Sequence, residues 1–454
     1  MKPCKKYMVR WIILLVLFVS NSYAQSGKWE VLAQKSDSAA FSGLLIPEKS
    51  GVGFNPYLSR IKEWADNSRI SADSLFYLLS HWNAYPKAEK TGIICRYWVQ
   101  LSDEYRVPYF VYIPEGYNPR HKTALLVYYK GGWLNRSQYP ARYEQEIITD
   151  NPTFSYLDGY NVIEIFPALK NDLAIYGKYG YAHLQKMVAE TKKIFNTDDN
   201  KVFLAGFSDG GKSVYNAASF VQTPFACFYP INSFPPSSPA YPNLINRPLF
   251  SFTAEKDAIT DWRSIKTKAE YVNRIGGKWN FRFMPGKAHF YKPYEKEVLP
   301  LLFEYIKVTN RDPLPLKVTY DRSFNDDDFK GVDWLQISVN TQKPPTPYHF
   351  SDTVRTYSAD GEESVRYYGE KTGQVRATFF DNTFTLITSQ TDSVTLYISP
   401  LMVDLDRPVK VIINGKILFD EKVSASKSFM AAHFLQNFDR DMIFVNRITV
   451  STPD

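Results

Sequence analysis

Apolar runs alternate with helical stretches between about residues 91 and 310. Most runs are continuous rather than interrupted at every second position, which is typical of parallel strands covered by helices on both faces. Helices are expected between them, for example at Tyr181–Phe195 and Ser213–Phe220, and the polar loop Ser102–Glu104 predicts an antiparallel hairpin at one edge. The pattern predicts an α/β domain with a mostly parallel sheet flanked by helices. Its strands are expected at Ile93–Val99, Tyr109–Ile113, Ala124–Tyr129, Asn161–Phe166, Lys201–Gly206, Phe225–Ile231, Pro248–Thr253 and Lys278–Met284.

The pattern changes after Asn310–Pro315, whose prolines predict a linker. Beyond it the apolar runs are short, rich in β-branched residues and often alternating. Asn414-Gly415 lies between two such runs, and this pair tolerates the positive φ angles of a type I′ hairpin turn. Residues 311–454 are therefore expected to form an all-β domain of the sandwich type. Ahead of the α/β domain, residues 25–90 are expected to form an N-terminal arm that packs against that domain, with helical spacing over Asn55–Trp82.

Residues 1–24 have the features of a signal peptide. Four basic residues precede a nine-residue apolar run, Trp11–Val19, and small residues end at Ala24 as in a cleavage site. The run is too short to span a bilayer, which takes about 20 residues, and no later segment approaches that length. We expect cleavage after Ala24, a secreted or periplasmic protein and no membrane span.

Charge and cysteines exclude several functions. Without the four basic residues of the signal segment, the formal net charge falls from +7 to +3, too little for nucleic-acid binding to be expected. Cys95 and Cys227 each lie in an apolar, strand-like stretch, so two separately buried thiols are expected. Neither has a Cys or His at metal-ligand spacing, and no metal or cofactor is predicted.

The chemistry is expected at Gly206-Phe-Ser208-Asp-Gly210, between a predicted strand and a predicted helix. In that setting the G-x-S-x-G pattern is a nucleophile elbow. The turn is so sharp that side chains two residues before and two residues after the serine would collide, so both positions need glycine. Ser208 is therefore the expected nucleophile, raised above the sheet at a helix N-terminus.

A nucleophilic serine needs a histidine base and a carboxylate that orients it, in the chain order serine, acid, histidine. His289 is the only histidine between Asp257 and the predicted linker, and it follows a predicted strand. Asp257, at the end of the preceding strand, is the expected acid. Glu255 and Asp261 remain alternatives from the sequence alone.

Acyl transfer also needs donors for the oxyanion. One is expected to be the backbone N–H of Asp209. The other is expected in the loop after the third strand, where the paired glycines Gly131 and Gly132 let the backbone approach a substrate. The main chains of Gly131, Gly132 and Trp133 are the candidates.

Residues from about 106 to 306 resemble secreted α/β-hydrolase esterases, especially the group of feruloyl esterases and polyhydroxybutyrate depolymerases. The resemblance is carried by Pro108–Pro114, the Gly131-Gly132 pair, Gly206–Gly211, Ala254–Asp257 and Ala288-His289. It implies an α/β-hydrolase fold and small-molecule or polysaccharide esters as substrates, acetyl or feruloyl esters among them. Lys130 stands where such proteins usually have histidine, and the C-terminal part resembles an accessory domain fused to such hydrolases.

The expected function is hydrolysis of a carboxylic ester through an acyl-enzyme, with a Ser-His-Asp triad. Two alternatives remain open. One is a serine peptidase of the prolyl-oligopeptidase type that lacks the β-propeller of such enzymes. Residues 25–90 are too few to form that propeller. The other is a non-catalytic carbohydrate-binding protein on a hydrolase scaffold.

Overall fold

The structure is a computed structural model. It describes residues 45–46, 55–88, 90–134, 136–138, 151–175, 179–236, 240–323, 330–358 and 361–453, with only the backbone at 45–46 and 366–367. The predicted signal peptide, residues 1–24, lies outside the described residues, so its cleavage stays a prediction.

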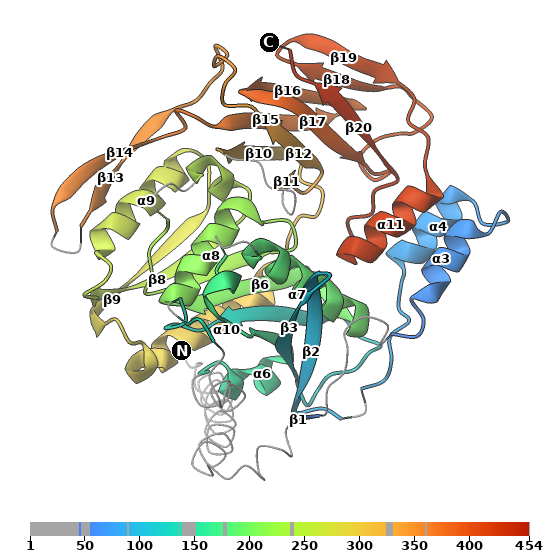
Figure 1. The fold of residues 1–454 in the computed structure, drawn as a ribbon. Helices are drawn as coiled ribbons and strands as arrows, with labels where there is room; N and C mark the ends of the chain where they lie inside the picture. Colours follow the sequence, from blue (N-terminus) through green and yellow to red (C-terminus); the bar gives the residue numbers. More distant parts are fainter. Residues whose placement is uncertain are drawn as a thin grey trace, which may run out of the picture.

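A nine-stranded mixed sheet forms the centre of the protein (Figure 1). Its spatial order is β1-β2-β3-β5-β4-β6-β7-β8-β9. The strand β3 is antiparallel to both β2 and β5, whereas β4 to β9 run parallel. The sheet fits an α/β-hydrolase fold. The bounds are β1 Leu45–Ile46, β2 Ile93–Ser102, β3 Tyr105–Ile113, β4 Thr123–Tyr129, β5 Val162–Pro167, β6 Thr197–Phe207, β7 Cys227–Ile231, β8 Leu249–Lys256 and β9 Trp279–Ala288.

All eight strands expected between residues 91 and 310 are present, and β2 and β3 form the predicted antiparallel hairpin. The expectation that this hairpin lies at the edge is wrong by one strand, because the two-residue β1 pairs in parallel with the outer side of β2. Cys95 on β2 and Cys227 on β7 are both buried and form no disulfide with each other, since β3, β5, β4 and β6 separate their strands.

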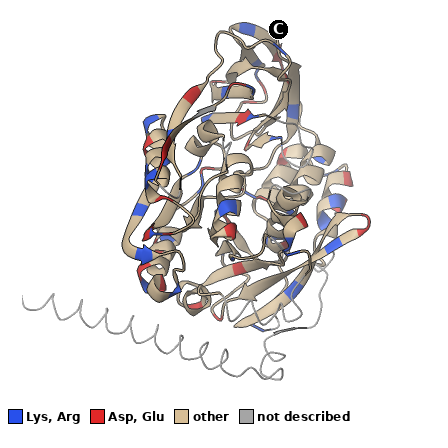
Figure 2. Cartoon of the chain, turned by 60° about the vertical axis from the view of Figure 1, so that its left-hand side comes forward, with Lys and Arg blue, Asp and Glu red and all other residues tan. Residues whose placement is uncertain are grey.

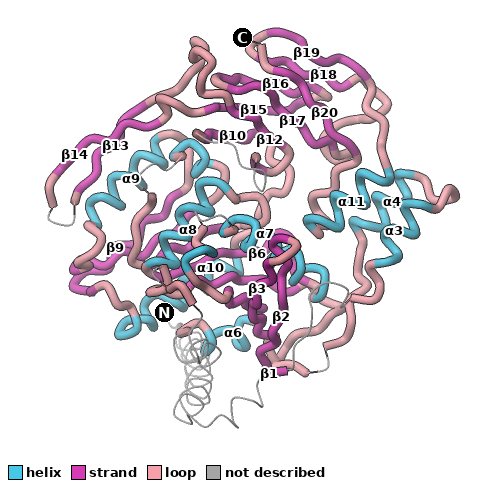
Figure 3. The backbone as a smooth tube through the Cα atoms, in the orientation of Figure 1, coloured by secondary structure: helices cyan, strands magenta, loops and turns pink. Residues whose placement is uncertain are grey.

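Helices cover both faces of the sheet, as the continuous apolar strands predict (Figure 3). On β4, Leu125 and Val127 pack toward one face, whereas Leu126 and Tyr128 pack toward the other. The first face is covered by α7 (Gly180–Ile194), α8 (Asp209–Phe220) and α9 (Trp262–Arg274), the second by α6 (Phe154–Tyr160) and α10 (Glu295–Val308). Short 3-10 helices occur at η1 (Asn171–Leu173), η2 (Tyr241–Ile245) and η3 (Lys292–Tyr294).

Beyond residue 316 the chain is mainly β structure. Two sheets share one hydrophobic core, which is consistent with the β-rich unit expected there. Asn414 and Gly415 have φ angles of 50° and 82° and connect β18 to β19, which confirms the predicted hairpin turn. One sheet contains β10 (Lys317–Arg322), β15 (Gly373–Phe380), β16 (Thr383–Ser389), β18 (Val409–Ile413) and β19 (Lys416–Glu421); the other contains β11 (Gly331–Val332), β12 (Leu335–Val339), β17 (Thr391–Ile398) and β20 (Asn446–Ser451).

In the described part of the N-terminal arm, the helical spacing over Asn55–Trp82 corresponds to two helices, α3 (Ser59–Asp66) and α4 (Ala72–Ser80). Both pack against α11 (Lys427–Asn437), a helix that the sequence pattern did not predict (Figure 1). Their apolar side chains belong to the core of the C-terminal β-rich part. The arm also touches the α/β part, because the Asn55 amide donates to the Lys193 carbonyl at 2.8 Å.

A buried cluster of charged residues holds the predicted linker between the α/β part and the β-rich part. Arg311 contacts Asp439 at 2.9 Å, and Lys192 of α7 contacts Asp439 at 3.1 Å and Asp199 at 2.7 Å. The Arg440 guanidinium contacts Asp199 at 2.6 Å. None of these five residues is more than 4% exposed. Burial alone would raise the pKa of Asp439, but the positive charges of Arg311 and Lys192 hold it well below its ordinary value.

Side-chain amides join the two parts at a second place. Asn243 of η2 bonds to the carbonyl and N–H of Asp321, and Asn246 bonds in the same way to Thr319. The two amides thus satisfy the outer edge of β10 as a neighbouring strand would. Together with the charge cluster, they fix the β-rich part against the α/β part.

Lys and Arg are interspersed with Asp and Glu over the chain rather than segregated by sign (Figure 2). Within the described ranges, the helices are too short or too polar to cross a bilayer.

Glu164 on β5 is a buried acid in the centre of the sheet. Both of its carboxyl oxygens lie 2.7 Å from the Thr153 hydroxyl. Burial raises its pKa to about 8, although hydrogen bonds from Thr153 and Asn151 act in the opposite direction. The folded protein therefore keeps this proton up to a higher pH than the unfolded chain does.

Because the pKa of Glu164 is raised, the free energy of unfolding is expected to fall as the pH rises. Glu164→Gln is expected to remove this pH dependence. Between about pH 4.5 and about pH 8 the unfolded chain has released the proton and the folded chain has not, so the free energy of unfolding falls by at most roughly 1.4 kcal/mol per pH unit. Urea unfolding of wild type and Glu164→Gln at pH 5 and pH 8 measures the difference. The exposed Glu270→Gln is the control. An equal pH dependence in wild type and Glu164→Gln would contradict this assignment.

Candidate active site

Ser208 lies at the turn between β6 and α8, where its φ of 54° and ψ of −117° place it in a strained conformation. A Cβ on Gly206 would lie 2.6 Å from the backbone of Gly210, and a Cβ on Gly210 would lie 2.0 Å from the Tyr129 carbonyl oxygen. Both glycines are therefore required, as the motif predicts. For Gly210 the obstacle is the neighbouring strand β4 rather than residue 206.

The structure brings Ser208, His289 and Asp257 into one hydrogen-bonded chain. The Nε2 atom of His289 lies 3.0 Å from the Ser208 Oγ, and its Nδ1 lies 2.8 Å from the Asp257 Oδ2. The other oxygen of Asp257 accepts the backbone N–H groups of Ile259 at 2.8 Å and Thr260 at 3.1 Å. The carboxylate is fully buried and the histidine side chain is 12% exposed. The imidazole is thus held between a fixed acceptor and the serine hydroxyl.

The two alternative acids have other partners. Glu255 accepts the backbone N–H of Gly286 at 2.6 Å. Asp261 caps the N-terminus of α9, accepting the Arg263 N–H at 2.8 Å, and forms an ion pair with the same arginine at 2.6 Å. Of the three carboxylates that the sequence offered, Asp257 is the one bonded to His289.

Asn232 and Ser233, which the sequence pattern did not single out, bind the backbone of two triad residues. Asn232 directly follows β7; its amide donates to the His289 carbonyl at 2.6 Å and its oxygen accepts the Ala254 N–H at 3.0 Å. The Ser233 hydroxyl donates to the Ser208 carbonyl at 2.7 Å. Two polar residues at the carboxyl end of a strand beside β6 are a signal that could have found them.

The expected oxyanion loop lies against the nucleophile. A Cβ on Gly131 would be 3.0 Å from the Ser208 Cβ, so a side chain here would crowd the nucleophile. Gly132 has a φ of 71°, which favours glycine, and Trp133 is buried against Tyr129. The Asp209 carboxylate reaches the same loop, 3.5 Å from the Leu134 N–H. The loop at Gly131 therefore lies close to Ser208, and the role of its backbone N–H groups as oxyanion donors stays a prediction.

Apolar side chains are exposed next to the triad. The His289 ring lies 5.1 Å from the Phe207 ring and 5.5 Å from the Phe290 ring, between their centroids. Phe290 is 72% exposed, Ile259 54% and Phe234 38%. Exposed apolar groups that gather in one place mark a candidate surface for binding another molecule.

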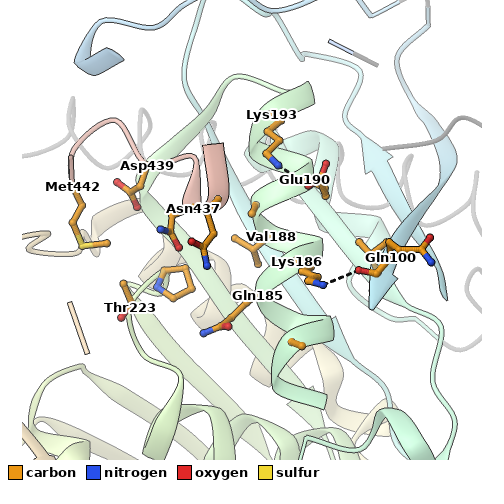
Figure 4. Close-up of a pocket in the computed structure, with 15 residues that line it drawn as sticks. Gln100, Gln185, Lys186, Val188, Glu190, Lys193, Thr223, Asn437, Asp439 and Met442 are labelled. Carbon is orange, nitrogen blue, oxygen red and sulfur yellow. Dashed lines mark hydrogen bonds and ion pairs between the residues drawn. The ribbon is translucent and has the colours of Figure 1, made fainter. Parts of the chain in front are cut away.

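A cavity of about 420 Å³ lies away from the triad, between α7 and the end of α11 (Figure 4). Gln185, Lys186 and Glu190 line one side, and Asn437, Asp439 and Met442 the other. None of the three triad residues lines it, so we do not assign catalysis to it. Among the described residues, no group of three or more His, Cys, Asp or Glu side chains could hold a metal ion.

No protein-family model matches the sequence, and no curated protein matches it. Among solved structures, a thermostable esterase is 16% identical over 48% of this chain and 63% of its own, with a TM-score of 0.38. The apo form of Thermogutta terrifontis esterase 2 is 15% identical over 46% of this chain and 91% of its own (TM-score 0.37), and a protein named FAE is 17% identical over 47% and 89% (TM-score 0.37). This chain spans less than two thirds of the first of these proteins. Structural similarities this weak say nothing about the activity of this chain.

Proposed function

We propose that this protein hydrolyses carboxylic esters through an acyl-enzyme formed on Ser208. The observation that carries the proposal is the chain of contacts from Asp257 through His289 to Ser208, at 2.8 and 3.0 Å. Nucleophile, base and orienting acid lie within hydrogen-bond reach of each other, and this arrangement activates a serine hydroxyl. The strained elbow holds that hydroxyl beside the glycine loop.

The reaction can be derived from this geometry. The Ser208 Oγ attacks the ester carbonyl carbon while His289 Nε2 takes the hydroxyl proton, and Asp257 stabilises the imidazolium. Backbone N–H groups of Asp209 and of Gly131 to Trp133 donate to the oxyanion. The tetrahedral intermediate then breaks its C–O bond to the alcohol, which leaves with the proton from His289. Water, deprotonated by His289, attacks the acyl-enzyme, and the carboxylic acid is released as Ser208 regains its proton.

The proposal extends to export and to the substrate class. The basic and apolar segments before Ala24 support secretion or transfer to the periplasm. The apolar rim of Phe207, Phe290, Ile259 and Phe234 supports an ester with apolar or ring-shaped parts, for which acetyl or feruloyl esters on polysaccharides are candidates.

Ester turnover is expected to exceed amide turnover. Wild-type protein lacking residues 1–24 is assayed with p-nitrophenyl acetate, methyl ferulate and a dipeptide anilide. We expect at least one ester to give a higher kcat/KM than the anilide, because ester leaving groups need less help from a general acid. Higher turnover of the anilide would favour the peptidase alternative.

Labelling with a fluorophosphonate separates the catalytic from the non-catalytic alternative. The probe reacts covalently with an activated serine, so one label per chain is expected at Ser208. An unlabelled wild-type protein would favour a binding protein on a hydrolase scaffold.

A further inference from the structure

A second cavity, of about 220 Å³, lies where the α/β part meets the β-rich part. Its walls come from the loops after β7 and β8, from η2 and α9, and from β13. The hairpin of β13 (Asp352–Tyr357) and β14 (Glu363–Tyr368) reaches from the β-rich part along α9 (Figure 1). The lining residues are Phe234, Pro235, Pro236, Tyr241, Ile259, Thr260, Asp261, Ser264, Lys268, Thr356 and Tyr357.

This cavity adjoins the triad on two sides. Ile259 and Thr260 are the residues whose backbone N–H groups bind Asp257. Phe234 follows Ser233, whose hydroxyl binds the Ser208 carbonyl. The exposed side chains of Phe234 and Ile259 belong both to this cavity and to the apolar rim of the triad. The segments that hold Asp257 and Ser208 in place therefore also form walls of this cavity.

The hairpin is held in position by polar contacts with α9. The Ser264 and Thr356 hydroxyls lie 2.7 Å apart in a buried contact, and Thr267 donates to the Arg355 carbonyl at 3.0 Å. The Tyr271 hydroxyl donates to Asp352 at 3.1 Å. This wall of the cavity is thus built before any ligand arrives, which lowers the cost of binding.

Aromatic packing continues the attachment of the hairpin. Tyr368 of β14 packs against Tyr241 and Tyr271, with ring centroids 5.2 and 5.4 Å away. The guanidinium of Arg263, on α9, lies 5.4 Å from the ring centroid of Tyr357, on β13. The Tyr357 ring therefore has a defined position at the cavity.

The lining indicates the kind of group that fits. Phe234, Tyr241 and Tyr357 supply aromatic surface. The rest of the lining includes polar groups, among which the Lys268 ammonium donates to the Ser264 hydroxyl at 2.9 Å. Ser and Thr hydroxyls can each donate one hydrogen bond and accept two. The volume is below that of pockets for drug-sized ligands, about 300–1,000 Å³. One ring with an apolar face and a hydroxyl-bearing edge, a single sugar unit, matches these features.

Resting on the proposed esterase activity, we infer that this cavity binds the sugar unit of an acylated glycoside and that the β13–β14 hairpin is a specificity element of the enzyme. The β-rich part then takes part in substrate selection, beyond supporting the α/β part. Tyr357 and Phe234 supply aromatic surface from opposite sides of the seam.

Tyr357→Ala tests the inference. It is expected to raise KM for a mono-O-acetyl methyl xyloside about tenfold with kcat nearly unchanged, because aromatic surface for the sugar is lost while the triad is intact. Turnover of p-nitrophenyl acetate, which lacks a sugar, is expected to stay within twofold. Phe234→Ala is expected to raise the same KM. Because Phe234 also belongs to the apolar rim of the triad, only the KM for the xyloside is read from this variant. Tyr348→Ala, which removes an exposed tyrosine of the same β-rich part, is the control.

The outcomes are distinct. A wild type that hydrolyses neither substrate contradicts the proposed function. Hydrolysis of p-nitrophenyl acetate together with an unchanged KM for the xyloside in both variants overturns the sugar site. So does an equal loss on both substrates in Tyr357→Ala, or an effect on methyl ferulate alone, which would indicate an aryl site. Thermal unfolding of each variant identifies a folding defect, in which case Phe234→Ala decides.

Discussion

Ser208→Ala is expected to lower kcat for p-nitrophenyl acetate by roughly 10⁴- to 10⁶-fold, the range found when a triad serine is removed elsewhere. Alanine has no oxygen to attack the carbonyl, while the oxyanion donors and the pocket remain. His289→Ala is expected to act about as strongly, because Ser208 then has no base. Asp257→Asn is expected to cost about 10⁴-fold, because an amide can donate to Nδ1 and favour the wrong tautomer.

These losses are expected not to add. Since the three side chains act as one unit, Ser208→Ala combined with His289→Ala is expected to be no slower than the worse single variant. Ser428→Ala on α11 and His81→Ala, both at exposed positions, are matched controls and are expected to keep full activity. Retention of more than a tenth of the wild-type kcat by Ser208→Ala would mean that another group is the nucleophile.

Asp439→Ala is expected to lower the free energy of unfolding by about 3–5 kcal/mol, the usual cost of removing one partner of a buried ion pair. Lys192 keeps Asp199 at 2.7 Å, but Arg311 loses its carboxylate and keeps only neutral partners such as the Thr223 carbonyl. A guanidinium left almost fully buried without its counter-charge is the physical cause. Urea unfolding at pH 7 measures the change.

The matched control is Asp420→Ala, which breaks the exposed ion pair between Lys410 and Asp420 in the same β-rich part. That change is expected to cost less than about 1 kcal/mol. Asp439→Ala is also expected to keep wild-type kcat below its melting temperature, because neither Asp439 nor its partners touch the triad. Equal destabilisation by the two variants would contradict a special role for the buried cluster.

The parts of the site that the sequence predicts depend on local requirements. The two glycines around Ser208 are demanded by a single turn, and the apolar runs on either side show where a strand ends and a helix begins. His289 is identified by chain order and by the lack of a competing histidine. In each case the evidence lies within a few residues, where backbone sterics and burial act directly on the choice of amino acid.

The choice of acid could not be made in this way. Glu255, Asp257 and Asp261 lie within seven residues, and each ends a strand or opens a helix. Only the fold shows the partner of each acid. Glu255 accepts the Gly286 N–H, Asp261 accepts an N–H at the start of α9, and Asp257 is bonded to His289. Asn232 and Ser233 were missed for the same reason, since their partners come from other strands.

The sequence by itself determined the α/β alternation, the elbow at Ser208, the histidine and the Asn414-Gly415 hairpin, because each is dictated by steric or apolar constraints between near neighbours. The tertiary structure alone decided which carboxylate orients His289, that the N-terminal helices pack on α11, and that the β13–β14 hairpin lines a cavity beside the triad. It also brought Lys192 to Asp439, 247 residues away. Such contacts join segments that are independent along the chain, so no local pattern records them.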